Sequence, residues 1–274
     1  MKVNVCRASC ATIICAMEKR ALQLVIQYDG AGFAGWQRQP EMRTVQGVLE
    51  EAMERLCGTR IPVLGAGRTD AGVHALGQAA GVRVTERWTS SELARALNAV
   101  LPRDIHISAC HAMRDDFHAR FSATSRSYRY LVGTDADAES PFRSARELAW
   151  KRPLDRAMLD QSARMIEGTH CFRGFAVKGT APETDDHRCT VTTARWLDRD
   201  GGLAFCITAN RFLHHMVRFL VGTMLDVASG RRDGSVIPGL LESADNRDVS
   251  PPAPAHGLYL ESVEYPRELY LVPA

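Results

Sequence analysis

Two features that stabilise very small proteins or anchor membrane proteins are missing from this sequence. No cysteine pair has the C-x-x-C spacing, and the eight cysteines show no cysteine–histidine spacing typical of zinc sites. The longest uncharged run near the N-terminus, residues 8–17, is about half of the ~20 residues that a membrane-spanning helix requires. The spacing gives no sign of a zinc site, and no membrane span is predicted. The scattered cysteines are typical of reduced thiols in a cytoplasmic protein.

Lysine is also scarce. The 34 basic residues include only 4 lysines, at positions 2, 19, 151 and 178, against 30 arginines. This bias is typical of a GC-rich genome, but arginine also suits phosphate binding and stacking on bases, and composition alone does not separate these readings. The remaining figures, 274 residues with 45% hydrophobic and 24% charged residues and a net charge of +2, describe an ordinary globular chain of one large or two modest domains.

Residues 1–17 precede the first regular pattern of the chain. The segment holds three of the eight cysteines, and its apolar stretch is too weak for a signal peptide and unlike a mitochondrial presequence. Met17 stands directly before a strand pattern. We therefore expect residues 1–17 to be a disordered extension or a start placed upstream of the true one.

Alternating apolar residues and turn signals predict strands and helices in both halves of the chain. Helices are expected over 45–56, 90–100, 154–167 and 212–228, the first between a Thr44 cap and Gly58, the second with a Thr89–Glu92 capping box. Strands are expected over 22–28, 61–64, 82–85, 105–110, 127–132, 190–197, 203–208 and 259–263, with a hairpin turn at 200–202. This order indicates an α+β protein of two lobes that share a sheet, placed at 18–124 and 125–274.

A glycine pattern near the start resembles a dinucleotide-binding turn but lacks its context. Gly30, Gly32 and Gly35 fit G-x-G-x-x-G after a strand. A dinucleotide site needs a helix immediately after this turn, because the helix N-terminus binds the pyrophosphate. Here no helix is expected before Thr44, so we interpret the match as coincidental.

The segment GAGRTDAGVHALGQ, residues 65–78, is more informative. Its glycines permit a tight turn, and its only acid, Asp70, stands between Arg68 and Gly72. A carboxylate among small residues can approach a substrate closely and act as a nucleophile. The same pattern also fits a glycine-rich turn whose aspartate caps backbone amides, and local chemistry leaves both interpretations open.

Basic and aromatic residues alternate in FHARFSATSRSYRYLV, residues 117–132, which contains no acid. Basic groups for phosphates combined with rings for bases suit single-stranded or looped RNA. When this segment is considered alone, an edge strand with one solvated basic face explains the pattern slightly better than an RNA-binding surface does.

The segment NRFLHHMVRFLVGTML, residues 210–225, contains adjacent histidines and an arginine. In the expected helix His214 and Arg218 share one face, whereas His214 and His215 point about 100° apart. That angle argues against shared metal ligation. Arg218, in so apolar a helix, requires a buried anionic partner.

Taken together, several of these segments resemble the tRNA pseudouridine synthase A family. They are YDGAGFAGWQRQP with GAGRTDAGVHALGQ, then DDFHARFSATSRSYRY, NRFLHHMVRFLVGTML and HGLYLESVEYP. The match runs from about residue 22 to residue 266, in the family's order. GRTDAGVHA is very specific to these enzymes. The resemblance implies an isomerase that breaks the uracil N1–C1′ bond of a tRNA uridine, turns the base and rejoins it through C5.

The resemblance further implies a target and a fold. The targets are positions 38, 39 and 40 of the tRNA anticodon stem-loop, modified by a cytoplasmic homodimer that needs no cofactor and no metal. The fold is the pseudouridine synthase fold, two related α/β lobes sharing a mixed, mostly antiparallel sheet with a basic cleft between them.

Roles for individual residues follow from the same resemblance. Asp70 matches the nucleophile, attacking either C1′ or C6, and Arg218 matches the basic residue that pairs with it. Tyr128 matches the ring that packs on the target uracil, and Arg68 stands beside the extruded nucleotide. The residues that match RNA-contacting positions are Phe117, His118, Ala119, Arg120, Phe121 and Lys178.

The loop of residues 178–187 departs from the family pattern. Glu183, Asp185 and Asp186 outnumber Lys178, and an acidic loop is unfavourable against phosphates. Such a loop would have to swing away from the RNA or contact a basic partner. A second functional hypothesis is a non-catalytic tRNA-binding or chaperone protein on the same scaffold, but such a protein would be expected to have lost Asp70, Tyr128 or Arg218.

Overall fold

The computed structural model describes residues 19–180, 184–243 and 245–271. The predicted extension at residues 1–17 lies outside this range. No helix in the described part of the chain has the length and apolar character needed to cross a membrane.

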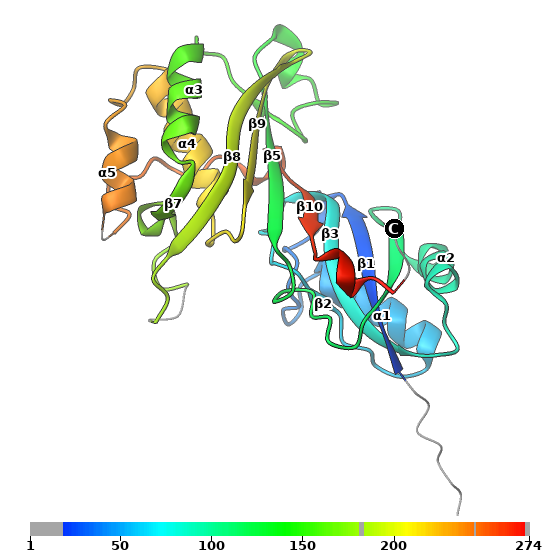
Figure 1. Cartoon of the computed structure of the whole chain (residues 1–274). Coiled ribbons are helices and arrows are strands. Elements are labelled where there is room, and N and C mark those ends of the chain that lie inside the picture. Colours follow the sequence, from blue (N-terminus) through cyan, green and yellow to red (C-terminus); the bar gives the residue numbers. More distant parts are fainter. Residues whose placement is uncertain (1–18, 181–183, 244, 272–274) are drawn as a thin grey trace, which may run out of the picture.

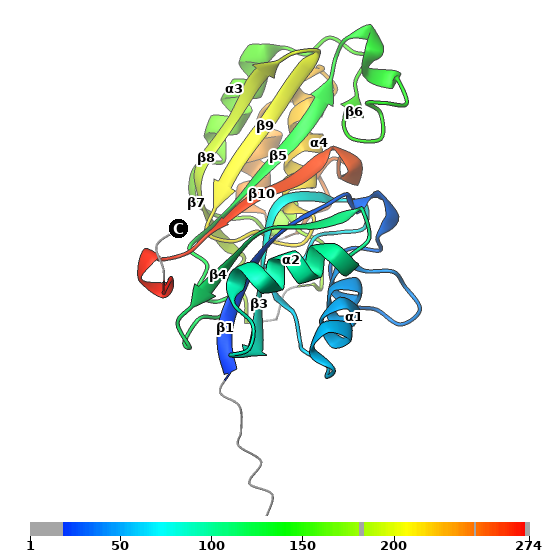
Figure 2. The ribbon, with the colours of Figure 1, turned by 90° about the vertical axis from the view of Figure 1, so that its right-hand side faces the viewer.

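One mixed sheet runs through both halves of the molecule (Figures 1 and 2). Its strand order is β4-β1-β3-β10-β5-β9-β8-β7, with the short β2 added to β3 and β6 to β5. Only the pairs β10–β3 and β5–β6 are parallel, so the sheet is mixed and mostly antiparallel, as predicted. The strands are β1 (Lys19–Tyr28), β2 (Leu64–Gly65), β3 (His74–Thr85), β4 (Ile105–Met113), β5 (Ser125–Gly133), β6 (Leu148–Ala149), β7 (Gly168–Cys171), β8 (Arg188–Arg199), β9 (Gly202–Ala209) and β10 (Leu258–Glu264).

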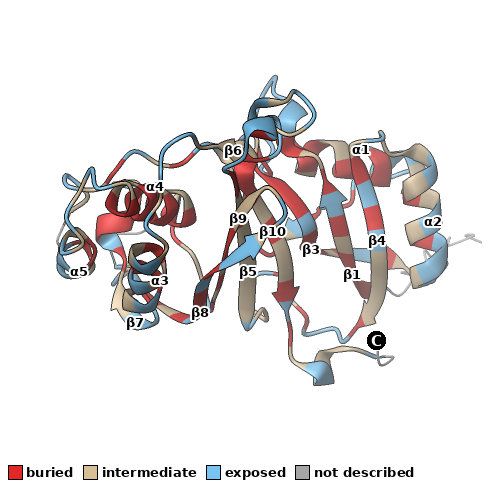
Figure 3. Ribbon diagram, turned by 90° about the horizontal axis from the view of Figure 1, so that it is seen from above, coloured by how far each residue is buried: buried red, intermediate tan, exposed pale blue. Residues whose placement is uncertain are grey.

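The helices gather at the two ends of this sheet (Figure 3). They are α1 (Val45–Cys57), α2 (Ser90–Val100), α3 (Arg156–Met165), α4 (Met216–Ala228) and α5 (Val236–Glu242). Thr44 caps α1, Gly58 ends it in a left-handed conformation, and Thr89 with Glu92 forms the predicted capping box of α2. The structure confirms these predicted helix ends. They could be predicted because capping depends on a few adjacent residues.

Each half of the sheet has its own hydrophobic core. One core lies between β1, β3 and β4 and the helices α1 and α2, and the other lies between β8 and β9 and the helices α3, α4 and α5. Strand β10 joins them, because its Leu258 belongs to the second core whereas Leu260 and Val263 belong to the first. The division at residue 124 stays a prediction, and the last strand of the chain contributes to both cores.

Two predicted element boundaries are wrong in ways that matter for the site. Strand β3 begins at His74 rather than at residue 82, because residues 74–81 are rich in alanine and glycine and, apart from Leu76 and Gly81, buried, so they show no apolar–polar alternation. Helix α4 begins at Met216 rather than at residue 212. His215 precedes it with a φ of 62°, a left-handed conformation that interrupts the helix. His214 and His215 therefore do not lie on the helix.

Candidate active site

The loop that carries Asp70 joins β2 to β3 and is held tightly by its neighbours. The amide of Trp36 donates to the Thr69 carbonyl at 3.1 Å, and the hydroxyls of Tyr28 and Thr69 are 2.7 Å apart. The Val73 amide donates to the Asp70 carbonyl at 3.2 Å and closes the turn. Asp70 is thus presented on a fixed backbone, with its side chain 19% exposed.

The glycines that resemble a dinucleotide motif serve this loop. Residues 30–32 form a single 3₁₀ turn, and no helix follows them directly. A Cβ on Gly30 would lie 2.0 Å from the Val73 carbonyl oxygen, and one on Gly35 would lie 2.8 Å from that of Thr69. Gly35 also has a φ of 101°. These glycines permit close packing of the Asp70 loop.

Three side chains from the opposite lobe surround the Asp70 carboxylate. Arg218 Nη1 donates to Asp70 Oδ2 at 3.0 Å, and His215 Nε2 lies 3.2 Å from the same oxygen. His214 Nε2 lies 3.4 Å from Oδ1. Burial lowers the pKa of His215 from its usual value, and the negative charge of Asp70 acts in the opposite sense. One carboxylate therefore faces three nitrogen groups, at the point where the lobes meet.

The geometry corrects the prediction for the two histidines and identifies the partner of Arg218. The imidazole rings do not diverge by 100°, since their centroids are 4.2 Å apart and both Nε2 atoms face Asp70. The anionic partner required by Arg218 is Asp70. Arg218 Nε also donates to the Ala253 carbonyl at 2.7 Å, and the Ala253 amide donates back to the Arg218 carbonyl.

Tyr128 lies on β5 beside this cluster. Its half-buried ring meets Phe212 edge-on, with centroids 4.9 Å apart. Burial raises the pKa of the Tyr128 hydroxyl well above its usual value, and the nearby charge of Asp70 raises it further. Tyr128 is therefore a neutral ring at physiological pH, available for stacking and hydrogen bonding.

Arg126 is an organising residue that the sequence interpretation counted only among the basic residues. Its guanidinium donates to four carbonyl oxygens from three segments: those of Ala66, Arg120, Ala123 and Asn210, at 2.8–3.2 Å. Burial lowers the pKa of the guanidinium. Arg126 stands two residues before Tyr128, so both project from the same face of β5. The two-residue spacing from Tyr128 was the sequence signal that could have pointed to Arg126. Its backbone carbonyl acceptors cannot be identified from the sequence.

The predicted RNA-contacting residues divide into exposed and buried groups. Arg68, Arg120 and Lys178 are exposed, and Phe121 is 77% exposed. The half-buried His118 shapes this loop, because its Nδ1 accepts from the amides of Arg120 and Phe121 at 3.1 and 3.3 Å. Phe117 and Ala119 are buried in the first core, 7% and 1% exposed, so their side chains are not available to RNA.

Comparison with known proteins gives this geometry a family context. The family model described as tRNA pseudouridine synthase matches residues 24–122 and 162–266, which include Asp70 and Arg218. The chain belongs to the tRNA pseudouridine synthase family. Members of this family are isomerases that convert uridine to pseudouridine.

Several proteins named tRNA pseudouridine synthase A are similar over nearly the whole chain. The one from Chloroflexus aurantiacus is 44% identical over 255 residues, which cover 90% of this chain and 89% of the relative. The one from Roseiflexus sp. (strain RS-1) is 43% identical over 91% of this chain and 92% of the relative. The one from Chlorobaculum tepidum is 40% identical over 91% of this chain and all of the relative.

In this tRNA pseudouridine synthase family member, the acidic loop carries less free charge than its sequence indicates. Asp185 is 11% exposed and pairs with Arg211, whose guanidinium lowers the pKa of the Asp185 carboxyl. Asp186 Oδ1 accepts from the Arg188 amide at 2.9 Å. Glu183 lies outside the described residues. The acidic count therefore overstates the repulsion that this loop would exert on RNA.

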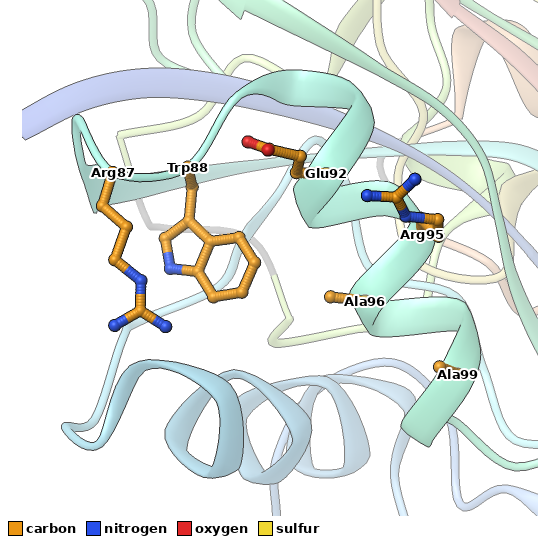
Figure 4. Close-up of a pocket in the computed structure, with 6 residues that line it drawn as sticks. All are labelled: Arg87, Trp88, Glu92, Arg95, Ala96 and Ala99. Atoms are coloured by element: carbon orange, nitrogen blue, oxygen red, sulfur yellow. The ribbon is translucent and has the colours of Figure 1, made fainter.

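A pocket of about 400 Å³ lies away from the Asp70 cluster (Figure 4). It is formed by α2 and the residues just before it, and it shares no residue with the Asp70 cluster. Its lining residues are Arg87, Trp88, Glu92, Arg95, Ala96 and Ala99. The pocket is therefore separate from the Asp70 cluster.

Proposed function

We propose that this chain converts uridine to pseudouridine at positions 38, 39 and 40 of the tRNA anticodon stem-loop, with Asp70 as the nucleophile. The observation that carries the proposal is the position of Asp70. One carboxylate, on a fixed loop between the two lobes, is paired with Arg218 and remains 19% exposed to a reactant. The family and its relatives support tRNA as the substrate.

In the proposed reaction, the carboxylate of Asp70 attacks C1′ of the ribose or C6 of the base. The N1–C1′ bond breaks, the uracil turns and a C5–C1′ bond forms. The bond to Asp70 breaks to return the free carboxylate, C5 loses its proton to solvent, and N1 takes up one proton. A carboxylate is ionised at neutral pH and needs no separate base to make it nucleophilic. Arg218 orients Asp70 and balances its charge, while Tyr128 packs against the uracil.

RNA contacts are proposed for the exposed members of the predicted set. Arg68 lies on the same loop as Asp70 and would hold the extruded nucleotide. Arg120 and Phe121 offer a charge for phosphate and a ring for a base, while His118 shapes their loop and Lys178 adds a second positive charge. These contacts would offset the few kcal/mol that removing a base from its stem costs. Following the family, we propose a homodimer that acts in the cytoplasm without a cofactor.

The test is tritium release from tRNA labelled at C5 of uridine, because C5 loses its hydrogen only when the base is rejoined there. Wild type, Asp70→Asn and the control Asp104→Asn would be compared. Asp70→Asn keeps the shape of the side chain, and Asp104 is a surface carboxylate paired with Arg43. We expect release by wild type and Asp104→Asn and none by Asp70→Asn.

Two results would contradict the proposal. Release by Asp70→Asn at the wild-type rate would remove Asp70 as the nucleophile. Tight tRNA binding by wild type without release from any tRNA would favour the non-catalytic binding protein. Substrates labelled only at position 38, 39 or 40 then test the proposed positions one at a time.

A further inference from the structure

Three side chains with metal-binding atoms converge in the site. The carboxylate of Asp70 and the imidazoles of His214 and His215 each offer one ligand atom, and these atoms lie within 4.8 Å of one another. Over residues 19–180, 184–243 and 245–271, no other group of three histidine, cysteine or acidic side chains meets this condition. The convergence is therefore specific to this place in the molecule.

The left-handed conformation of His215 creates the convergence. In a continuous helix, adjacent imidazoles point about 100° apart and cannot share an ion. Here His215 has a φ of 62° and stands before the first residue of α4. Both imidazoles consequently face the Asp70 carboxylate, each toward a different oxygen.

The observed separations are close to those around one tetrahedral ion. Bonds from Zn²⁺ to imidazole nitrogen and to carboxylate oxygen are about 2.0–2.2 Å long, which places two ligand atoms about 3.3 Å apart. His214 Nε2 is 3.4 Å from Asp70 Oδ1, which matches this spacing, while His215 Nε2 is 3.2 Å from the other oxygen, Oδ2, and the three ligand atoms all lie within 4.8 Å of one another. A rotation of the His215 imidazole toward Oδ1 brings all three ligand atoms around one point.

We propose that Asp70, His214 and His215 bind a divalent transition metal ion such as Zn²⁺ or Co²⁺, and that the bound ion blocks Asp70. Two imidazoles and one carboxylate suit these ions, whereas Mg²⁺ and Ca²⁺ prefer oxygen ligands. The ion takes Oδ1 while Arg218 stays on Oδ2. Water can supply a fourth ligand, because the His214 side chain is 43% exposed and solvent reaches the cluster. The blocking effect rests on the proposed function, whereas the binding does not.

Metal binding is measured directly on the full chain, with Co²⁺ and Zn²⁺ as the probes. The Co²⁺ absorption spectrum separates imidazole and carboxylate ligands from thiolates, which the eight cysteines of the chain also offer. The variants are His214→Ala and His215→Asn, since asparagine tolerates the left-handed backbone. His106→Gln, an exposed histidine on β4, is the matched control.

We expect His214→Ala and His215→Asn each to lower the affinity for Co²⁺ and Zn²⁺ by at least about tenfold. Loss of a residue that only hydrogen-bonds to a metal ligand already lowers metal affinity by about that factor. His106→Gln keeps the wild-type affinity, and excess Mg²⁺ does not compete. Equal affinities in wild type and both site variants, or a spectrum of thiolate ligation alone, would overturn the site.

The blocking effect is tested separately by tritium release. Zn²⁺ should inhibit the wild type, a chelator should restore activity, and higher tRNA concentrations should reduce the inhibition. Binding at the site without inhibition would overturn the blocking step. If the wild type releases no tritium at all, the proposed function fails, and the direct binding measurement still decides whether the metal site exists.

Discussion

Arg218 Nη1 lies 3.0 Å from Oδ2 of Asp70, so a guanidinium of one lobe holds the carboxylate of the other. The pair is largely shielded from water, with 14% and 19% of the two side chains exposed. The same guanidinium donates to the Ala253 carbonyl through Nε. Arg218 therefore links the nucleophile proposed here to the segment that leads into β10.

Arg218→Met should lower the rate of tritium release by at least about a hundredfold, because the proposed nucleophile loses a preorganised charged partner. Stability should fall by about 2 kcal/mol, the typical effect of losing hydrogen bonds to a charged group. Arg218→Lys should recover stability better than activity, since an ammonium cannot serve both partners in the same geometry. Urea denaturation and tritium release measure the two effects, and near-wild-type release by Arg218→Met would refute the role.

A second prediction concerns Arg126 and its neighbour on the other face of β5. Arg126→Met leaves four carbonyls in three segments without a donor, so it should cost about 3 kcal/mol and lower activity. The matched control is Arg129→Met, whose side chain is 36% exposed and forms an ion pair with Glu261 at 3.1 Å. That change should cost less than about 1 kcal/mol. Equal losses of stability in urea denaturation would show that the carbonyl contacts of Arg126 do not organise the site.

A comparison of variants at Phe117 and Phe121 distinguishes a side chain that packs in the core from one that contacts RNA. Phe121→Ala should leave stability unchanged but weaken tRNA binding by about tenfold or more, since stacking on a base contributes about 1–3 kcal/mol. Phe117→Ala should cost about 3–5 kcal/mol of stability, because it empties a core position beside Tyr265. Thermal unfolding and tRNA titration at fixed salt test the pair. Unchanged tRNA affinity of Phe121→Ala would exclude the proposed stacking.

These contrasts show what the sequence could and could not predict. The ends of α1 and α2 were predictable because a cap acts between neighbouring residues. The prominence of Asp70 was predictable because a lone acid among glycines is unusual, and the requirement that Arg218 have an anionic partner followed from its apolar surroundings.

Other features depend on contacts between distant segments. The burial of Phe117 and Ala119 could not be predicted from an alternation that does not say which face meets the core. The direction of His214 and His215 depends on one left-handed residue, because the apolar pattern continued through it and indicated a longer helix. The contacts of Arg126 involve only backbone carbonyls, which every residue possesses.

The buried His74 predicts a dependence of stability on pH. Its side chain is 3% exposed, its Nδ1 accepts from the Gly30 amide at 3.1 Å, and its ring stacks on Tyr259. Burial lowers the pKa of His74, and the charge of Asp29 opposes this shift while the charge of Arg146 adds to it. The folded protein therefore takes up this proton at lower pH than the unfolded chain does. The contribution of neutral His74 to the free energy of unfolding is fully present above the unfolded pKa of about 6.5 and is lost as the pH falls below that value.

Urea denaturation of wild type and His74→Gln at pH 7.5, 6.5 and 5.5 measures this contribution. The glutamine variant should be less stable at pH 7.5, because it disturbs a packed ring. Below pH 6.5 the wild type should lose up to about 1.4 kcal/mol per pH unit more than the variant, since one proton is linked to unfolding. His106→Gln, at an exposed position, should follow the wild-type profile. Parallel profiles for wild type and His74→Gln would show that His74 takes up its proton equally in both states.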